Sequence, residues 1–364
     1  MPEAAIAHII ARAYEIETDA PEADGTLEWD RTTLVLVEIE AGGETGLGYT
    51  YANRCLVPLV ENTLAALVGG RSALDIPGAN AALWRGIRNL GRPGLVATAI
   101  SAVDIALWDL KAKLLGVPLA VLLGRAREHV AIYGSGGFTS YSDEQLQAQL
   151  VGWVEREGCR WVKMKIGSEP DHDPARVRAA RRAIGGHGLF VDANGAFSPK
   201  QALALAWRLN DEGVGWFEEP VSSGDLAGLN QLREQGPAGM DIAAGEYGYT
   251  LDDFRRLAER PSIDVLQADV TRCGGISGFL QVSALCDAHH IDLSGHCAPS
   301  AHLHVACAVR RLRHLEWFHD HVRVERLLFD GAPEPRNGFV EPDLARPGLG
   351  LTFKERDAER YRVC

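Results

Sequence analysis

The sequence predicts an α/β protein built around a (β/α)8 barrel. Eight short β-rich runs lie between residues 130 and 318, and helical stretches rich in Ala, Leu, Arg and Glu separate them. The span divides into units of roughly 24 residues, close to the ~30 per unit of a ~250-residue barrel. An open doubly wound sheet is the main competing fold. No G-x-G-x-x-G follows a first strand, so a dinucleotide site is not expected.

The first 125 residues predict a smaller α+β domain. The pattern is strand-like from residue 6 to residue 51. After a first strand, residues 33–40 are rich in β-branched side chains, and a turn at 41–43 separates them from a further strand at 46–51. Helical apolar spacing follows over residues 57–68, 79–90 and 97–115. The acidic, turn-rich segment 18–30 is predicted to be a mobile surface loop.

The barrel is predicted to occupy residues 126–324. Its eight strands are expected at residues 130–133, 161–166, 189–192, 216–218, 242–244, 265–269, 291–294 and 314–318. Helical segments such as 145–156, 175–184 and 200–210 lie between them. The tail, 325–364, is rich in proline and glycine, and we expect it to pack back on the first domain, 1–125.

The composition argues against several classes of function and of structural support. The chain has 364 residues and a formal net charge of -12, which argues against a nucleic-acid backbone or an anionic membrane as the main partner. The seven cysteines are scattered without a C-x-x-C pair, so neither a disulfide framework nor a zinc ribbon is expected. The most apolar stretch, 95–123, is interrupted by charged residues, and the N-terminus lacks a signal-peptide pattern. We expect a soluble, cytoplasmic protein.

Polar residues recur where the predicted barrel strands end. They are Lys165, Asp192, Glu218, Glu246, Asp269, His296 and Glu316, separated by 27, 26, 28, 23, 27 and 20 residues. Catalytic groups of such barrels sit at the C-terminal ends of different strands. A single acid after a strand is often only a helix cap or a turn residue. Seven residues in phase predict one site, where so many carboxylates would be costly without a cation.

The carboxylates predict a metal site. Asp192, Glu218 and Glu246 come from three successive strands, and hard oxygen ligands of this kind suit Mg2+, or Mn2+, rather than zinc. Strand alternation would put the neighbouring Glu219 on the opposite face, where an ion pair with a helix is expected.

The strand ends also predict two bases. Lys163 and Lys165 are two residues apart on one strand, so both point into the barrel and should lower each other's pKa. The alternative is an outward-facing pair in surface salt bridges. Asp269 and His296 end neighbouring strands, where the carboxylate would orient the imidazole and raise its basicity, giving a second acid/base group opposite Lys165. A hydrogen-bonded core histidine is the alternative for His296.

Several motifs together resemble the enolase superfamily, and within it the mandelate racemase subgroup. They are Lys163-Met164-Lys165, Val191-Asp192-Ala193-Asn194, Glu218-Glu219-Pro220, Ala244-Gly245-Glu246, Gln267-Ala268-Asp269, Gly274-Gly275, Gly295-His296, Leu315-Glu316 and the helix segment around Asp104 and Asp109. The resemblance implies a (β/α)7β TIM-like barrel under an N-terminal α+β capping domain.

The resemblance also implies residue roles. Mg2+ would bind Asp192, Glu218 and Glu246. Lys165 would be one base and the His296–Asp269 pair the other. Lys163 and Glu316 would contact the substrate carboxylate. The similar muconate-cycloisomerase subgroup carries a lysine where this chain has Asp269, which argues against a cycloisomerase.

The implied reaction is abstraction of the α-proton of a hydroxy carboxylate through an enediolate. Elimination of water from an acid sugar would then give a 2-keto-3-deoxy acid. A racemase or epimerase using the same bases is the alternative, and a catalytically silent barrel that acts as a binding protein is a third. We expect an aldonic or aldaric acid as substrate, no nucleic-acid or membrane partner, and a homo-oligomer.

Two capping segments, 18–30 and 46–55, are expected to select the substrate. Candidate contacts are Tyr49, Tyr51, Asn53 and Arg54 in the cap and Asn194 in the barrel. Loop packing and surface charge are the alternative roles of the cap residues.

Overall fold

The capping domain begins with an antiparallel sheet. In this computed structural model, which describes residues 4–364, the strands β1 (Ile6–Ala23), β2 (Glu28–Ala41) and β3 (Glu44–Tyr51) lie in that order. Helical segments cover one face of the sheet: α1 (Leu56–Leu59), the π-helical η1 (Val60–Leu64), α2 (Ala65–Val68), α3 (Ile76–Gly86) and α4 (Leu95–Leu114). Alternation along β2 buries Val35 and Val37 against these helices, whereas Leu34 and Leu36 face the core shared with the barrel.

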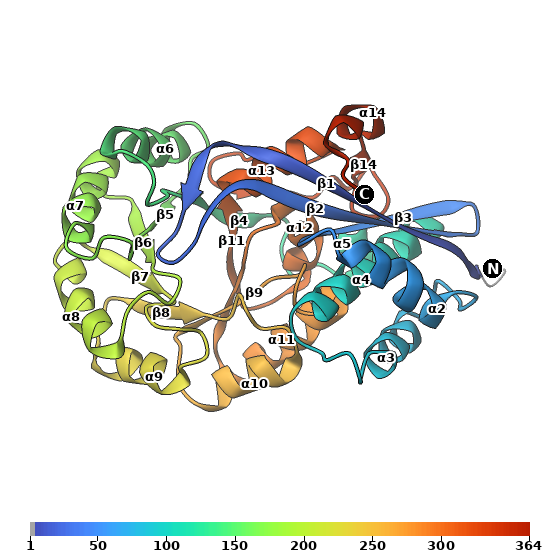
Figure 1. Cartoon of the computed structure of the whole chain (residues 1–364), viewed down its shortest axis with the longest axis horizontal. Helices are drawn as coiled ribbons and strands as arrows, with labels where there is room; N and C mark the ends of the chain where they lie inside the picture. The colour runs from blue at the N-terminus through green and yellow to red at the C-terminus, as the bar shows by residue number, and fades with distance from the viewer. Residues whose placement is uncertain (1–3) are drawn as a thin grey trace.

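The prediction of a mobile loop at residues 18–30 is wrong. β1 continues to Ala23 and β2 begins at Glu28, and the two strands form a long hairpin that reaches from the cap across the barrel (Figure 1). The tip is held by hydrogen bonds to the barrel: Thr139 N donates to Ala23 O at 2.8 Å, and Ser140 Oγ donates to Pro21 O at 2.6 Å. Acidic residues therefore mark a strand that lies against a second domain.

Eight parallel strands form a closed barrel within residues 4–364. They are β4 (Val130–Gly136), β5 (Trp161–Lys165), β6 (Gly188–Asp192), β7 (Val214–Glu218), β8 (Asp241–Ala244), β9 (Val265–Ala268), β10 (Asp292–Gly295) and β11 (Leu312–Phe318). Each pairs with the next, and β11 pairs with β4 to close the ring. All eight predicted strands are confirmed, with boundary shifts of a few residues.

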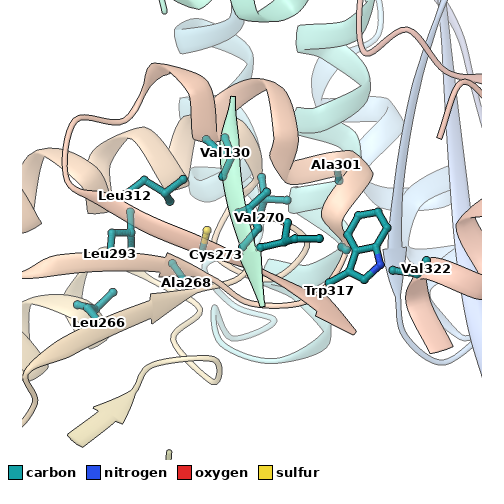
Figure 2. Close-up of a cluster of buried hydrophobic side chains, with 14 of the residues drawn as sticks. Val130, Leu266, Ala268, Val270, Cys273, Leu293, Ala301, Leu312, Trp317 and Val322 are labelled. Carbon is teal, nitrogen blue, oxygen red and sulfur yellow. The ribbon is translucent and has the colours of Figure 1, made fainter. Parts of the chain in front are cut away.

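Seven helices connect the eight strands. They are α6 (Asp143–Glu155), α7 (Asp173–Ile184), α8 (Pro199–Asn210), α9 (Leu226–Gln235), α10 (Leu251–Glu259), α11 (Gly275–His289) and α12 (Pro299–Ala308), and the short α5 (Leu119–Leu123) precedes the barrel. Apolar residues between strands and helices form the main core. Figure 2 shows part of it, where Leu293 and Leu312 are paired on β10 and β11 and Trp317 lies near Val322.

The tail runs back along the capping domain. α13 (His319–Leu328) follows the last barrel strand, and β12 (Phe329–Asp330), β13 (Phe339–Val340), β14 (Thr352–Phe353), α14 (Glu355–Ala358) and the 3-10 turn η2 (Glu359–Tyr361) complete the chain. Val363 N donates to Ala13 O at 2.9 Å, and Leu349 N donates to the buried Asp109 Oδ1 at 2.7 Å. The proposed boundary at 324/325 falls inside α13.

Among residues 4–364, no helix is both long enough and apolar enough to cross a membrane.

Candidate active site

The strand ends bring the seven predicted polar residues to one end of the barrel. Register places them: Lys165 is paired with Asp192 across β5 and β6, and Asp192 with Glu218 across β6 and β7. Glu246 lies two residues beyond β8, while Asp269 and His296 follow β9 and β10 directly. All seven residues are at most 6% exposed. Below them Tyr133, Phe190 and Trp216 fill the barrel interior, so the site has an apolar floor.

Three of the carboxylates are arranged to hold a metal ion. Asp192, Glu218 and Glu246 each offer an oxygen, and these oxygens lie within 4.8 Å of one another. Other donors fix two of them: Asn194 N donates to Asp192 Oδ1 at 2.9 Å, and Trp216 Nε1 donates to Glu218 Oε2 at 2.9 Å.

The charge balance of the site also favours a cation. Six buried carboxylates gather there, and they are Asp192, Glu218, Glu219, Glu246, Asp269 and Glu316. The permanent cations paired with members of this group are Lys163, Lys165 and Arg272. Because buried charge is costly unless it is compensated, this excess of negative charge fits a divalent ion. All-oxygen ligation fits Mg2+.

Both lysines point into the barrel, as predicted, but their pKa values move the other way. Lys163 Nζ lies 2.8 Å from Glu316 Oε1 and contacts Glu218, and Lys165 Nζ contacts Asp192. Burial lowers the pKa of Lys165, but the carboxylates around it, Asp192 first among them, together outweigh burial and raise it. Burial also lowers the pKa of Lys163, and Glu218 and Glu316 are the main groups that raise it. Lys163 does lower the pKa of Lys165, as expected, but the prediction of a net lowering is wrong because carboxylates surround each ammonium group.

The predicted imidazole–carboxylate pair is present. His296 Nδ1 lies 2.9 Å from Asp269 Oδ2, and the other ring nitrogen, Nε2, lies 3.2 Å from Glu246 Oε2 and 3.6 Å from Glu316 Oε2. Burial lowers the pKa of His296, but its acidic neighbours, including Cys297, Glu246 and Glu316, outweigh burial and raise it well above its usual value. The ring is held by one carboxylate and presents its second nitrogen to the site.

Glu219 does not make the expected ion pair with a helix. β7 ends at Glu218, and the positive φ of 36° at Glu219 breaks the strand alternation on which that prediction depended. The side chain is 1% exposed, and within residues 4–364 its Oε1 has no hydrogen-bond partner. Burial, and then the charge of Glu246, raises its pKa well above the usual value. The raised pKa of Glu219 therefore reflects its burial and the carboxylates that surround it.

Three residues of the site were not predicted. Ser135 Oγ donates to Glu316 Oε1 at 2.5 Å, Arg272 Nε lies 3.6 Å from Asp269 Oδ2, and Cys297 Sγ lies 3.4 Å from His296 Nε2. Ser135 could have been found from alternation, since it is two residues from the inward-facing Tyr133. Cys297 has a φ of 51°, so no strand pattern indicates where its side chain points.

The predicted substrate contacts differ in their surroundings. Asn194 Oδ1 accepts a hydrogen bond from Lys165 Nζ at 3.1 Å. Tyr51 stacks on His321 with ring centroids 3.4 Å apart. Tyr49 is fully buried, and its hydroxyl donates to Glu325 Oε1 at 2.6 Å, so it holds the cap on the barrel and is not free to meet a substrate. Asn53 and Arg54 are exposed.

Family models match both domains. The model described as "Mandelate racemase / muconate lactonizing enzyme, N-terminal domain" matches residues 16–124, and "Enolase C-terminal domain-like" matches residues 145–358. The chain belongs to the enolase superfamily, mandelate racemase subgroup. In this enolase-superfamily protein, both the capping domain and the barrel with its polar strand ends thus match models of the family.

Similar structures span the whole chain. A mandelate racemase/muconate lactonizing enzyme-like protein from Rubrobacter xylanophilus has 53% identity and a TM-score of 0.96, covering 99% of this chain and 100% of that chain. A racemase from Streptomyces coelicolor with bound magnesium has 30% identity and a TM-score of 0.92, covering 98% and 100%. Magnesium in that neighbour and the acidic triad here support Mg2+ as the cofactor.

Curated relatives carry more than one activity. L-talarate/galactarate dehydratase of Salmonella typhimurium is 33% identical, covering 89% of this chain and 81% of the relative. The 3,6-anhydro-alpha-L-galactonate cycloisomerase of Streptomyces coelicolor is also 33% identical, covering 88% and 89%. Cycloisomerases thus stand beside dehydratases among the relatives, and the prediction that Asp269 argues against a cycloisomerase finds no support there.

Proposed function

We propose that this protein removes the α-proton of an acid sugar and then expels the β-hydroxyl as water, giving a 2-keto-3-deoxy acid. One observation carries the proposal: an ammonium group and an imidazole flank the same carboxylate triad. Lys165 contacts Asp192 at one side, and His296 Nε2 lies 3.2 Å from Glu246 at the other. A substrate bound at the triad would have one acid/base group on each side.

Lys165 is proposed as the base. Asp192, Glu218 and Glu246 would hold a divalent cation, whose charge would acidify the substrate α-proton and offset the effect of the Asp192 carboxylate on the pKa of Lys165. The neutral amine then takes the proton from C2, and the C–H electron pair enters the enediolate. Asn194 Oδ1, 3.1 Å from Lys165 Nζ, would hold the amine in place before and after the transfer.

His296 is proposed as the acid for the leaving group. Its pKa is raised, so the ring carries a proton near neutral pH. That proton passes to the C3 hydroxyl, the C3–O bond breaks, and water leaves as the enol forms. The enol becomes the 2-keto product when C3 takes a proton from solvent. Asp269 positions the ring and stabilises its charged form.

Lys163 and Glu316 are proposed to orient the substrate carboxylate. Lys163 is fully buried and already shared between Glu218 and Glu316, so it can add a hydrogen bond to an anionic oxygen without moving far. Glu316 is held by Ser135 and Lys163. Tyr51 and Arg54 stay candidates for contacts with the distal end of the substrate.

Two other outcomes share these groups. Reprotonation of C2 from the opposite side would give an epimer, and the His296 imidazole facing Lys165 across the triad favours that alternative. Intramolecular ring opening, as the name of the cycloisomerase relative suggests, would begin with the same removal of the C2 proton. A ring C–O bond would then break in place of the C3–OH bond, and a proton would return to the product, which keeps the composition of the substrate. A homo-oligomer, a cytoplasmic location and the division into residues 1–125, 126–324 and 325–364 also remain proposals.

A substrate panel tests the proposal. The Mg2+-loaded protein is incubated with aldonic and aldaric acids and their lactones, and products are followed by a 2-keto acid assay and by NMR. Formation of a 2-keto-3-deoxy acid from at least one member supports dehydration. An epimer or a cycloisomer without keto product would replace it with the corresponding alternative. No conversion and no binding of any member would favour a catalytically silent barrel.

A further inference from the structure

A second group of potential metal ligands lies outside the active site. Asp19 and Glu22 belong to β1 in the capping hairpin, and His319 is the first residue of α13, directly after the last barrel strand. One donor atom from each lies within 4.8 Å of the others. In Figure 1 the hairpin crosses the barrel from the cap, so these residues join two parts of the fold that are 300 residues apart in sequence.

Glu22 is the unusual member of the group, because its carboxylate is buried and only one of its two oxygens accepts a hydrogen bond. The residue is 1% exposed, and Trp29 Nε1 donates to its Oε2 at 2.8 Å. Within residues 4–364, no group is hydrogen-bonded to its Oε1. An unpaired buried carboxylate oxygen costs free energy in either protonation state, since a proton on it would also need an acceptor.

The surrounding charges do not compensate Glu22. Asp320 is a further carboxylate that acts on Glu22 by its charge. Arg323 Nη2 lies 2.5 Å from Asp320 Oδ1, and Thr32 also donates to Asp320. Arg323 is therefore committed to Asp320. Burial, followed by the charge of Asp320, raises the pKa of Glu22 to about 9. The group lacks a positive charge between Glu22 and Asp19.

The contact between His319 and Asp19 does not supply the positive charge that Glu22 lacks. His319 Nε2 lies 2.9 Å from Asp19 Oδ2 and 3.1 Å from Asp19 Oδ1, so one ring nitrogen is paired with the Asp19 carboxylate. Glu22 receives nothing from that pair. A metal ion bound to one atom of each residue would compensate all three.

We propose that Asp19, Glu22 and His319 form a second divalent-cation site that fastens the capping hairpin to the end of the barrel. One imidazole nitrogen and two carboxylate oxygens suit a borderline ion such as Zn2+ better than Mg2+, which prefers oxygen ligands alone. Donor atoms that lie within 4.8 Å of one another can reach Zn2+ bonds of about 2.0–2.2 Å through side-chain adjustments. The half-exposed Asp19 leaves a route for the ion to enter.

The site is distinct from the catalytic one in residues and in metal preference. Its role would be to lock the hairpin in its position across the barrel, and it takes no part in proton transfer. The inference therefore stands whether or not the dehydration proposal holds.

Zinc binding to the Mg2+-saturated protein tests the proposal. Equilibrium dialysis against Zn2+, with metal content measured by elemental analysis, is compared between the wild-type protein and Asp19→Asn, Glu22→Gln and His319→Gln. Because active-site groups such as His296 and Cys297 can also take Zn2+, the readout is the difference between proteins. We expect the wild type to hold one ion more than each variant, or to bind it at least 10-fold more tightly.

The control is His172→Gln. His172 Nδ1 lies 2.7 Å from Glu169, but both residues are exposed and no second carboxylate completes a described metal group there. This variant should keep the wild-type zinc content. Asp19 is half exposed, so Asp19→Asn should fold even if a change at the buried Glu22 does not. Equal zinc content in the wild type and Asp19→Asn would overturn the proposal, as would equal losses in His172→Gln.

Discussion

Nδ1 of His296 lies 2.9 Å from Oδ2 of Asp269, and Oδ1 of the same carboxylate accepts hydrogen bonds from both the backbone N and the side-chain Oγ of Thr271 at 2.7 Å. The carboxylate is thus fixed from one side and fixes the imidazole from the other. This arrangement decides which ring nitrogen carries a proton toward Asp269 and leaves Nε2 for the substrate.

Asp269→Asn should reduce kcat by about 10²- to 10⁴-fold, because an amide can donate to Nδ1 and so favours the wrong tautomer. Steady-state kinetics on the best panel substrate would measure the loss. The control is Asp211→Asn, which changes an exposed carboxylate and should leave kcat unchanged. A wild-type kcat in Asp269→Asn would contradict the assignment of the His296–Asp269 pair as the second acid/base group.

Removal of the metal should destabilise the protein, because the carboxylate triad then loses its compensating charge. Adding Mg2+ to EDTA-treated protein at about 100 times Kd should raise the free energy of unfolding by about 2.7 kcal/mol. Differential scanning calorimetry would show this as an increase in Tm. Asp192→Asn should abolish the increase, whereas Asp171→Asn, at an exposed aspartate, should retain it. An equal Mg2+ response in all three proteins would contradict the ligand assignment.

Gly25, at the tip of the capping hairpin, should not tolerate a side chain. A Cβ there would lie 2.4 Å from Ala193 O and 2.6 Å from Ile166 O, both backbone atoms at the ends of barrel strands. Gly25→Ala should therefore lift the tip from the barrel. We expect an increased KM with only a small decrease in Tm. Gly186→Ala is the matched control, since a Cβ there meets nothing within 4 Å. Unchanged KM in Gly25→Ala would mean that the tip does not help to enclose the substrate.

The eight strands and the phased polar residues could be predicted from the sequence because each depends on local pattern and spacing. The hairpin at residues 18–30 could not, because its acidic residues resemble a solvated loop until the barrel that covers Glu22 is known. The direction in which the pKa values of Lys163 and Lys165 shift depends on carboxylates that other strands bring close. The spacing of residues along the sequence does not give the distances between these carboxylates and the ammonium groups. Positive φ at Glu219 and Cys297 likewise breaks the alternation on which strand-based predictions depend.

Stability should fall as pH rises toward neutrality, and Glu325 should account for part of the fall. Burial raises its pKa from 4.5 to about 7. The folded state therefore favours the protonated form, so its contribution is fully present below about pH 4.5 and is lost as pH rises through about 7. The contribution is about 3 kcal/mol at most. Glu325→Gln should flatten the slope of unfolding free energy against pH in this window.

Urea unfolding at several pH values measures that slope. The slope, rather than the absolute stability, is the readout, because an amide can also disturb the hydrogen bonds from Tyr49 and Ser300. Glu341→Gln, at an exposed carboxylate, should keep the wild-type slope. If Glu325→Gln keeps it as well, Glu325 does not titrate as described.

Turnover in D2O by the Mg2+-loaded wild type, Lys165→Met and His296→Asn, followed by NMR, would show whether both groups take part in the reaction. Exposed residues provide the controls, Lys200→Met and His187→Asn. We expect a 2-keto product with solvent deuterium at C3 from the wild type and both controls. We expect no net product from either active-site variant, although both should fold. Wild-type turnover in Lys165→Met or in His296→Asn would contradict the account of two groups acting from opposite sides of the carboxylate triad.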